Sequence, residues 1–132
     1  MKKIIVFLFV TCSLAGYSQN LDCSKLKTGY FLNIDSSTGN TFIKRTDMYQ
    51  YETDVNSGVK IKLQIVWLND CTYKLKFIKG NAKWKKEKHL MNNPDLIVKI
   101  TSVGDDYYTQ VAHFEGIETH KYRSTIKIVT KN

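Results

Sequence analysis

The chain carries few groups capable of chemistry, and their spacing matches no common catalytic or metal-binding pattern. Its imidazoles are His89, His113 and His120. None stands in a His-Glu-x-x-His motif, in a Cys/His zinc spacing or beside a Gly-x-Ser-x-Gly turn. The sequence has no glycine-rich phosphate loop, and the adjacent carboxylates Asp105 and Asp106 follow Gly104 in a turn-forming stretch. We therefore expect a protein that is not an enzyme and holds no cofactor.

One metal-site hypothesis involves His113, Glu115 and His120. Residues two apart on a strand share a face, and a returning strand would bring His120 close to the other two. Exposed polar residues around a turn at Glu115 and Gly116 give the same pattern. We expect no metal ion here, and these three residues are the candidate to check.

A second candidate is the basic segment from Lys79 to His89. It contains Trp84 and a single acidic residue, Glu87, among the lysines Lys79, Lys83, Lys85, Lys86 and Lys88. A basic surface with an aromatic ring could hold an anionic polymer or rest on a membrane surface. In the alternative interpretation, Trp84 covers one end of the fold while the lysine side chains stay solvated.

The N-terminus has the pattern of a secretory signal peptide. Lys2 and Lys3 precede an apolar run that begins at Ile4 and ends at small and polar residues. Cleavage after Ser18 would leave a mature domain of residues 19–132. Cleavage at Ala15 or Gly16 is the alternative. The run is shorter than the roughly 20 apolar residues that cross a bilayer. We expect an exported protein, periplasmic or extracellular, that is not transmembrane.

The mature chain stays basic. Removing residues 1–18 takes away two of the 20 Lys and Arg residues and none of the 12 Asp and Glu residues. A positive surplus favours association with anionic partners such as lipopolysaccharide, anionic lipid or extracellular DNA, without specific nucleic-acid recognition. A soluble charged surface without a partner has the same composition.

The cysteines predict a disulfide. Cys12 leaves with the signal peptide, and Cys23 and Cys71 remain as an even pair in an oxidising compartment. Closing this 48-residue separation would stabilise the fold by about 4 kcal/mol in the chain-entropy model. Two free thiols or a redox pair are the alternatives, although no Cys-x-x-Cys motif is present.

The strongest structural signal is an alternation of apolar and polar residues from Val59 to Trp67 and again from Thr72 to Phe77. Two strands separated by a short polar stretch predict a hairpin. A three-residue loop of residues 69–71 would put the large side chains on one face. The predicted pairs are Trp67 with Tyr73, Ile65 with Leu75, and Leu63 with Phe77.

The rest of the chain repeats this pattern in shorter segments, separated by turn-forming residues. Residues 82–91 are rich in helix formers and predict one short helix. The fold class is mainly β: an antiparallel meander of about eight strands that curls into a small barrel or half-barrel. A two-sheet sandwich is the alternative. The other expected strands are Gly29 to Ile34, Thr41 to Arg45, Met48 to Thr53, Leu96 to Ile100, Tyr107 to Phe114 and Lys121 to Val129.

Three stretches carry a family resemblance: Cys23-Ser-Lys-Leu-Lys-Thr-Gly-Tyr-Phe, then Ile43-Lys-Arg, then Val66-Trp-Leu-Asn-Asp-Cys-Thr-Tyr-Lys-Leu. They resemble small exported proteins of unknown function from Gram-negative bacteria, some of which carry a DNA topoisomerase IV label that we regard as an error. The resemblance implies no activity. The expected shape is similar to lipocalin-like barrels, but Gly29-Tyr30-Phe31 stands where those have Gly-x-Trp.

Together these patterns predict a non-catalytic binding module that holds a small apolar or amphipathic ligand inside the curled sheet. The alternative is an envelope interaction protein that uses the surface from Lys79 to Lys88 to bind an anionic polymer or a protein partner.

Overall fold

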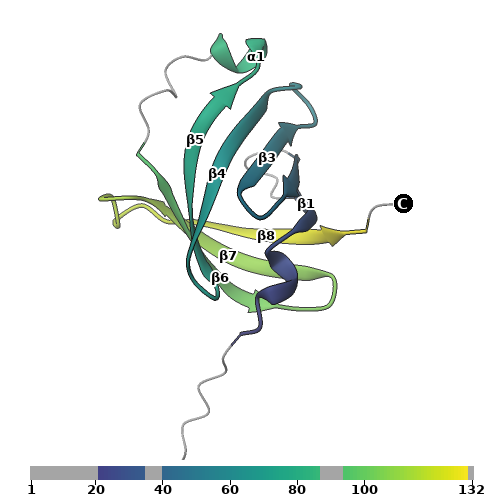
Figure 1. Cartoon of the computed structure of the whole chain (residues 1–132), viewed down its shortest axis with the longest axis vertical. Helices are drawn as coiled ribbons and strands as arrows, with labels where there is room; N and C mark the ends of the chain where they lie inside the picture. The colour runs from purple at the N-terminus through teal and green to yellow at the C-terminus, as the bar shows by residue number, and fades with distance from the viewer. Residues whose placement is uncertain (1–20, 35–39, 87–93, 131–132) are drawn as a thin grey trace, which may run out of the picture.

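The computed structural model describes residues 21–34, 40–86 and 94–130 (Figure 1). The predicted signal peptide of residues 1–18 lies outside these ranges, as do Lys88 and His89 of the basic segment. Among the described residues, no helix combines the length and the apolar character that crossing a bilayer requires.

In the part of the chain that the structure describes, eight antiparallel strands form one closed barrel. Each strand pairs with the next in chain order, and β8 returns to pair with β1. The predicted meander barrel is confirmed, and the two-sheet sandwich is excluded. The elements are the 3-10 helix η1 (Ser24–Leu26), β1 (Gly29–Asn33), β2 (Thr41–Arg45), β3 (Tyr49–Asp54), β4 (Lys60–Asn69), β5 (Thr72–Gly80), α1 (Ala82–Lys85), β6 (Leu96–Val103), β7 (Tyr107–Phe114) and β8 (Tyr122–Val129).

The apolar side chains point into the barrel because they alternate with polar residues along each strand, and successive strand residues face opposite sides. The register carries this inner face around the ring, for example from Phe31 to Ile43 on the neighbouring strand. The hydrophobic core comprises Cys23, Leu26, Phe31, Ile43, Leu63, Ile65, Tyr73, Leu75, Val98, Ile100, Tyr108, Ala112 and Ile126.

The central hairpin has the predicted register but a different turn. Trp67 pairs with Tyr73, and the two other predicted pairs of β4 and β5 are also present. The three-residue loop is wrong: β4 continues to Asn69, which pairs with Thr72 around a turn of Asp70 and Cys71. A register shift between Trp67 and Asn69 supplies the odd residue that keeps the large side chains on one face.

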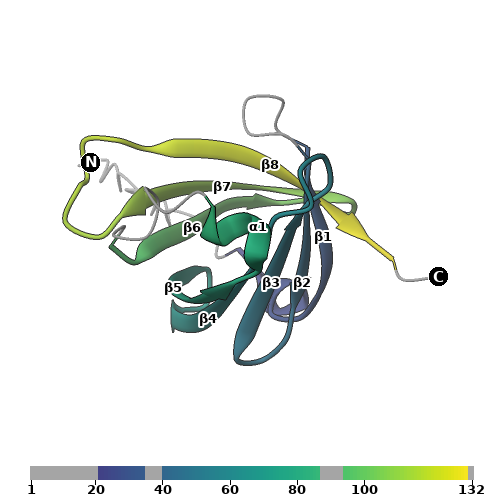
Figure 2. The same cartoon turned by 90° about the horizontal axis from the view of Figure 1, so that it is seen from above.

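The two ends of the barrel carry different covers, and we name them the η1 end and the α1 end. At the η1 end, Cys23 is bonded to Cys71, with their Cα atoms 5.5 Å apart, so the predicted disulfide is confirmed. The bridge holds η1 against the turn between β4 and β5. At the opposite end, α1 lies over the ring of strands (Figures 1 and 2).

The helix is shorter over the described residues than the predicted range of 82–91. It spans Ala82–Lys85, and residues 87–93 lie outside the described ranges. Asn81 caps it, since its Oδ1 accepts a hydrogen bond from the backbone N–H of Trp84 at 3.1 Å. The Asn81 Nδ2 group also donates to the carbonyl oxygen of Gly58 at 2.9 Å. These bonds fix α1 to the turn that precedes β4.

Candidate functional site

The interior of the η1 end is organised around one arginine. Arg45 ends β2 with its side chain inside the barrel and is 2% exposed. Its guanidinium donates to Gln50 Oε1 at 3.0 Å and to the carbonyl oxygen of Leu26 at 2.6 Å. It also donates to the phenol oxygens of Tyr73 at 3.1 Å and Tyr108 at 3.3 Å. A buried charge is tolerated when it is hydrogen-bonded in this way.

The hydrogen bonds continue from this arginine toward the α1 end along two sides of the barrel. On one side, Gln50 Nε2 donates to Glu52 Oε1 at 2.8 Å. On the other, the Tyr73 hydroxyl donates to Gln110 Oε1 at 3.1 Å, and Gln110 Nε2 donates to Ser124 Oγ at 3.1 Å. Each branch therefore extends the polar network from the core of the η1 end toward the middle of the barrel.

Aromatic rings fill the remaining space around Arg45. Its guanidinium carbon lies 4.6 Å from the ring centre of Phe31 and 4.9 Å from that of Tyr73, within cation–π range. Phe31 meets Tyr108 edge to face, with ring centres 5.7 Å apart. In the part of the chain described, no buried side-chain nitrogen or oxygen lacks a hydrogen-bond partner. The interior of the η1 end is thus closely packed, and its buried polar side chains are hydrogen-bonded.

The pKa values of the acidic groups in this network are shifted by burial. Burial raises the pKa of the half-buried Glu52 carboxyl, although the hydrogen bond from Gln50 and the charge of Arg45 lower it in part. Burial likewise raises the pKa of the Tyr73 and Tyr108 phenols above their ordinary values, opposed by Arg45. Both phenols therefore stay protonated at neutral pH and can act as hydrogen-bond donors but not as bases.

At the α1 end, large apolar side chains face inward and yet meet solvent. Phe77 pairs with the buried Leu63 and is 42% exposed. Tyr122 pairs with the buried Ala112 and is 48% exposed. Inner-face residues of a fully packed barrel would be covered, so the inner face is exposed to solvent at these two positions.

Trp84 contributes to the edge of the barrel at the α1 end, which we call the rim. Its ring stacks on Phe77 with ring centres 4.3 Å apart, and it is 7% exposed. It also lies against Gly80, where an added Cβ would sit 2.5 Å from Trp84 Cγ. Gly80 thus provides the space that lets the indole lie on the end of β5.

The strands themselves separate at the α1 end. β5 pairs with β6 from Thr72 to Leu75, and its last residues, Lys76 to Gly80, continue beyond this ladder. Lys76 still approaches Asp95 at 3.9 Å, just before β6 begins. Farther along, β5 lies beside β4, and the two strands run up to α1 (Figure 1). This divergence leaves Phe77 exposed.

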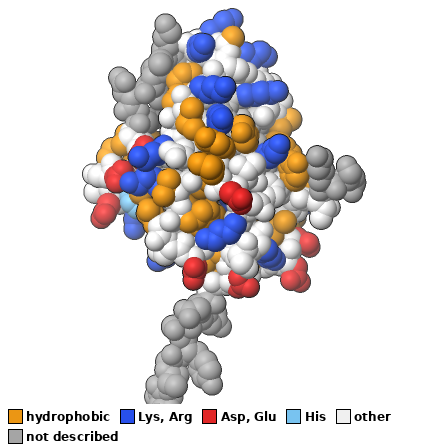
Figure 3. Space-filling model, viewed as in Figure 1, with side chains coloured by type: hydrophobic (Ala, Val, Ile, Leu, Met, Phe, Trp, Pro, Cys, Tyr) orange, Lys and Arg blue, Asp and Glu red, His pale blue; other side chains and the backbone are white. Residues whose placement is uncertain are grey.

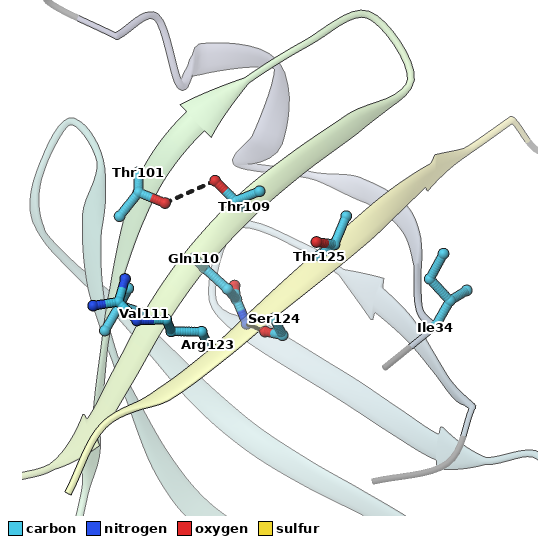
Figure 4. A pocket seen from close by; sticks show the side chains of 8 residues that line it. All are labelled: Ile34, Thr101, Thr109, Gln110, Val111, Arg123, Ser124 and Thr125. Atoms are coloured by element: carbon cyan, nitrogen blue, oxygen red, sulfur yellow. Dashed lines mark hydrogen bonds between the residues drawn. The ribbon is translucent and has the colours of Figure 1, made fainter. Parts of the chain in front are cut away.

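A hollow of about 700 Å³ lies on a different part of the surface, along β6, β7 and β8 (Figure 4). Its lining mixes polar and apolar side chains, with the Thr101 and Thr109 hydroxyls joined at 2.7 Å and Arg123 nearby. A threonine hydroxyl becomes a nucleophile beside a general base, and none of the described lining residues is His, Asp, Glu or Lys. The lining residues are Ile34, Thr101, Thr109, Gln110, Val111, Arg123, Ser124 and Thr125.

The structure does not gather the metal candidates. Within the described ranges, no group of three His, Cys, Asp or Glu side chains is placed to hold a metal ion. Glu115 Oε1 instead pairs with Lys74 Nζ at 3.0 Å. His120 lies beside Tyr122, with ring centres 5.9 Å apart, and His113 lies on the outward register of β7.

Most lysines of the basic segment are exposed around α1. Lys79, Lys85 and Lys86 are solvent-exposed, and Lys83 Nζ donates to the carbonyl oxygen of Ser57 at 3.0 Å. Basic side chains gather over this end, next to exposed hydrophobic ones (Figure 3). Because Trp84 is buried on Phe77, its ring has the covering position of the alternative interpretation rather than an exposed stacking position.

The polar network inside the barrel was not predicted from the sequence. Arg45 stands two residues after the buried Ile43, and Gln50 and Glu52 have the same spacing, so strand alternation alone would have placed them inside. Their polarity argued against an inner position, because charged residues are rarely buried without a partner. The partners, Tyr73 and Tyr108, come from strands far along the chain.

Comparison with protein-family models, with curated protein sequences and with solved structures finds no match. The functional proposal therefore rests on the geometry of the site.

Proposed function

We propose that this protein is a non-catalytic binding module that holds a small apolar or amphipathic ligand at the α1 end of the barrel. The observation that carries the proposal is the exposure of two inward-facing aromatic side chains, Phe77 and Tyr122, at this end. Exposed aromatic surface on an inner face is typical of ligand sites, which are concave and mostly apolar.

The ligand's apolar part would contact an aromatic rim. Phe114 and Tyr122 meet edge to face with ring centres 6.1 Å apart, and Phe77 and Trp84 stack. The exposed parts of Phe77, Phe114 and Tyr122 suit an apolar chain or ring system, and the buried Trp84 supports Phe77. Leu96, on the inner face of β6, is partly buried and adds to this rim.

The ligand's polar part would lie toward Gln50 and Glu52. Glu52 is half-buried on the inner face of β3, in register with Ile61 of β4. One carboxyl oxygen accepts from Gln50, and the group can accept a further donor from a ligand. An amphipathic molecule with a hydrogen-bond donor at one end fits this arrangement.

The proposal includes export to the periplasm or beyond. The Cys23–Cys71 bond is compatible with an oxidising compartment, where such bonds persist. The cross-link lies at the η1 end, opposite the proposed ligand site.

Native mass spectrometry of the chain, purified from the compartment in which it accumulates, tests for a bound molecule. We expect extra mass in the native spectrum that disappears on denaturation. Titration with the amphipathic probe 1-anilinonaphthalene-8-sulfonate then locates the site. Tyr122→Ser should weaken probe binding about 2- to 10-fold, the range for one aromatic contact.

The matched control is Tyr107→Ser. Tyr107 is 45% exposed, but it lies on the outward register of β7 at the η1 end. The Tyr107→Ser variant should bind the probe with the parent's affinity, within about twofold. A bare native mass together with equal affinities of the two variants would contradict the proposal.

The second candidate is binding of an anionic envelope polymer or a protein partner by the lysines around α1. It is favoured by the exposure of Lys79, Lys85 and Lys86. Reversal of Lys85 and Lys86 to glutamate should then abolish salt-sensitive retention on an anionic matrix. Unchanged retention would remove this candidate.

A further inference from the structure

A row of lysine and tyrosine side chains crosses the outside of the barrel from β2 to β5. Lys44 pairs with Tyr51, and Tyr51 pairs with Lys62 on the next strand. Lys62 in turn pairs with Lys79 on β5. Paired residues point to the same face of a sheet, so these side chains form one line across four strands. We call Lys44, Tyr51, Lys62 and Lys79 the lysine–tyrosine row.

Tyrosine rings orient two of the three ammonium groups of the row, those of Lys44 and Lys62. Lys62 Nζ lies 4.0 Å above the ring centre of Tyr49, which neighbours the row on β3, and 5.7 Å from that of Tyr51. Lys44 Nζ lies 5.9 Å from the Tyr51 ring centre. Cation–π contacts at such distances orient a flexible lysine without neutralising its charge.

The charge of the row is uncompensated among the described residues. Ion pairs there join Lys74 to Glu115 and Lys76 to Asp95, and none involves a lysine of the row. The acidic residues of β3 occupy inner-face register positions, and β2, β4 and β5 contain none. The outer face of these strands is therefore positive without an acidic neighbour on the same strands.

We propose that the lysine–tyrosine row binds a linear acidic polysaccharide. Neighbouring strands are about 4.8 Å apart, so Lys44 and Lys62 are about 10 Å apart and Lys79 lies about 5 Å farther along. A chain lying across the strands would meet a series of positive charges, two of them oriented by tyrosine rings, that match carboxylates or sulfates repeated along it.

Two observations favour a polysaccharide over single-stranded nucleic acid. Lysine ammonium groups lie over the rings of Tyr49 and Tyr51, and this leaves those rings less open to the stacked bases that single strands require. The Cys23–Cys71 bond also fits an oxidising compartment, where acidic polysaccharides are exposed. The row faces away from the barrel interior, so the proposal is independent of the small-ligand site.

The test measures binding of the full chain to immobilised polygalacturonate and heparin, with dextran as the neutral polymer and oligo(dT) as the nucleic acid. Lys44→Glu, Lys62→Glu and Lys79→Glu are combined in one variant. Its matched control combines Lys99→Glu, Lys121→Glu and Lys127→Glu, three exposed lysines on or beside β6 and β8. Both variants change the net charge equally.

We expect the row variant to bind polygalacturonate or heparin at least about tenfold more weakly, with a shallower salt dependence, and the control to stay within about threefold. Melting curves verify folding, and Lys79→Glu alone should show a smaller loss in the same direction. Three outcomes would each overturn the proposal: equal losses of binding in the two variants, tighter binding of oligo(dT) than of both polysaccharides, or no polysaccharide binding at physiological salt. Tyr122→Ser should leave this binding unchanged, which separates it from the small-ligand proposal.

Discussion

The two ends of the barrel are built from the same alternating strands but differ in what fills them. At the η1 end, Arg45 and the phenols of Tyr73 and Tyr108 form a buried, fully bonded cluster under a disulfide-held cap. At the α1 end, Phe77 and Tyr122 face inward and remain exposed. The difference indicates that the η1 end supplies stability, whereas the α1 end leaves inward-facing apolar surface exposed, which is where we propose that a ligand binds.

The largest effect is expected from Arg45→Ala. It removes the donor that serves Gln50 and two phenols and leaves a cavity, so the free energy of unfolding should fall by about 3–5 kcal/mol. Urea denaturation with the disulfide intact measures it. Lys44→Ala, at the exposed neighbouring position, should change stability by less than about 0.5 kcal/mol. A similar loss in both variants would mean that the buried cluster does not stabilise the η1 end.

Loss of the disulfide should have the next largest effect. The double variant Cys23→Ser and Cys71→Ser should lose about 2–4 kcal/mol, because the unfolded chain regains conformational freedom. Thermal melting of the variant, and of the parent with and without reductant, measures the loss. Probe binding at the α1 end should persist at temperatures where the variant stays folded. If binding disappears with the bridge, the two ends are coupled and the comparison is wrong.

Gly80→Ala acts at the α1 end. The new Cβ would overlap the Trp84 ring and displace it, which should lower stability by about 1–3 kcal/mol. In a Trp67→Phe background, the emission of Trp84 should shift to longer wavelength as the indole meets water. Unchanged emission would show that the rim relaxes without moving Trp84, in conflict with the packing described.

Glu52→Gln should have the smallest effect, and it depends on pH. The raised pKa of Glu52 means that the folded chain binds a proton more readily than the unfolded chain. The carboxyl thus favours folding at low pH, and this contribution is lost as the pH rises through its folded pKa. The glutamine keeps the acceptor for Gln50, so the variant should melt higher than the parent at pH 7.

This advantage should shrink as the pH falls toward the ordinary glutamate value of about 4.3. Melting temperatures measured between pH 7 and pH 4.5 compare the two proteins. A difference that grows on acidification would mean that the carboxylate, rather than the carboxylic acid, stabilises the folded state.

Much of the fold was predictable from the sequence, because its signals are local. Alternating apolar residues and turn residues predict strands such as Thr41–Arg45 and Tyr107–Phe114 with the observed bounds. The register of β4 and β5 followed from the need to share one apolar face. The position of the extra residue could not be predicted in this way. A bulge before the turn and a longer loop both let the two strands share one apolar face.

The candidate site was less predictable because its parts come together only in the closed barrel. Tyr73 and Tyr108 are far apart in the sequence, and their shared partner, Arg45, is on a third strand. The exposure of Phe77 depends on how far β5 and β6 diverge, which no local pattern encodes. The basic segment was recognised, but Trp84 within it is a packing residue.

The strand order also has a kinetic consequence. Pairings between consecutive strands close short loops, whereas the pairing of β1 with β8 joins Tyr30 to Val129 across nearly the whole described chain. Contacts of such high sequence separation form slowly, so we expect this seam to close last during folding. Until it closes, β1 and β8 are unpaired edges, which can add strands from other molecules. The seam, rather than either end, is therefore where aggregation of partly folded chains would begin.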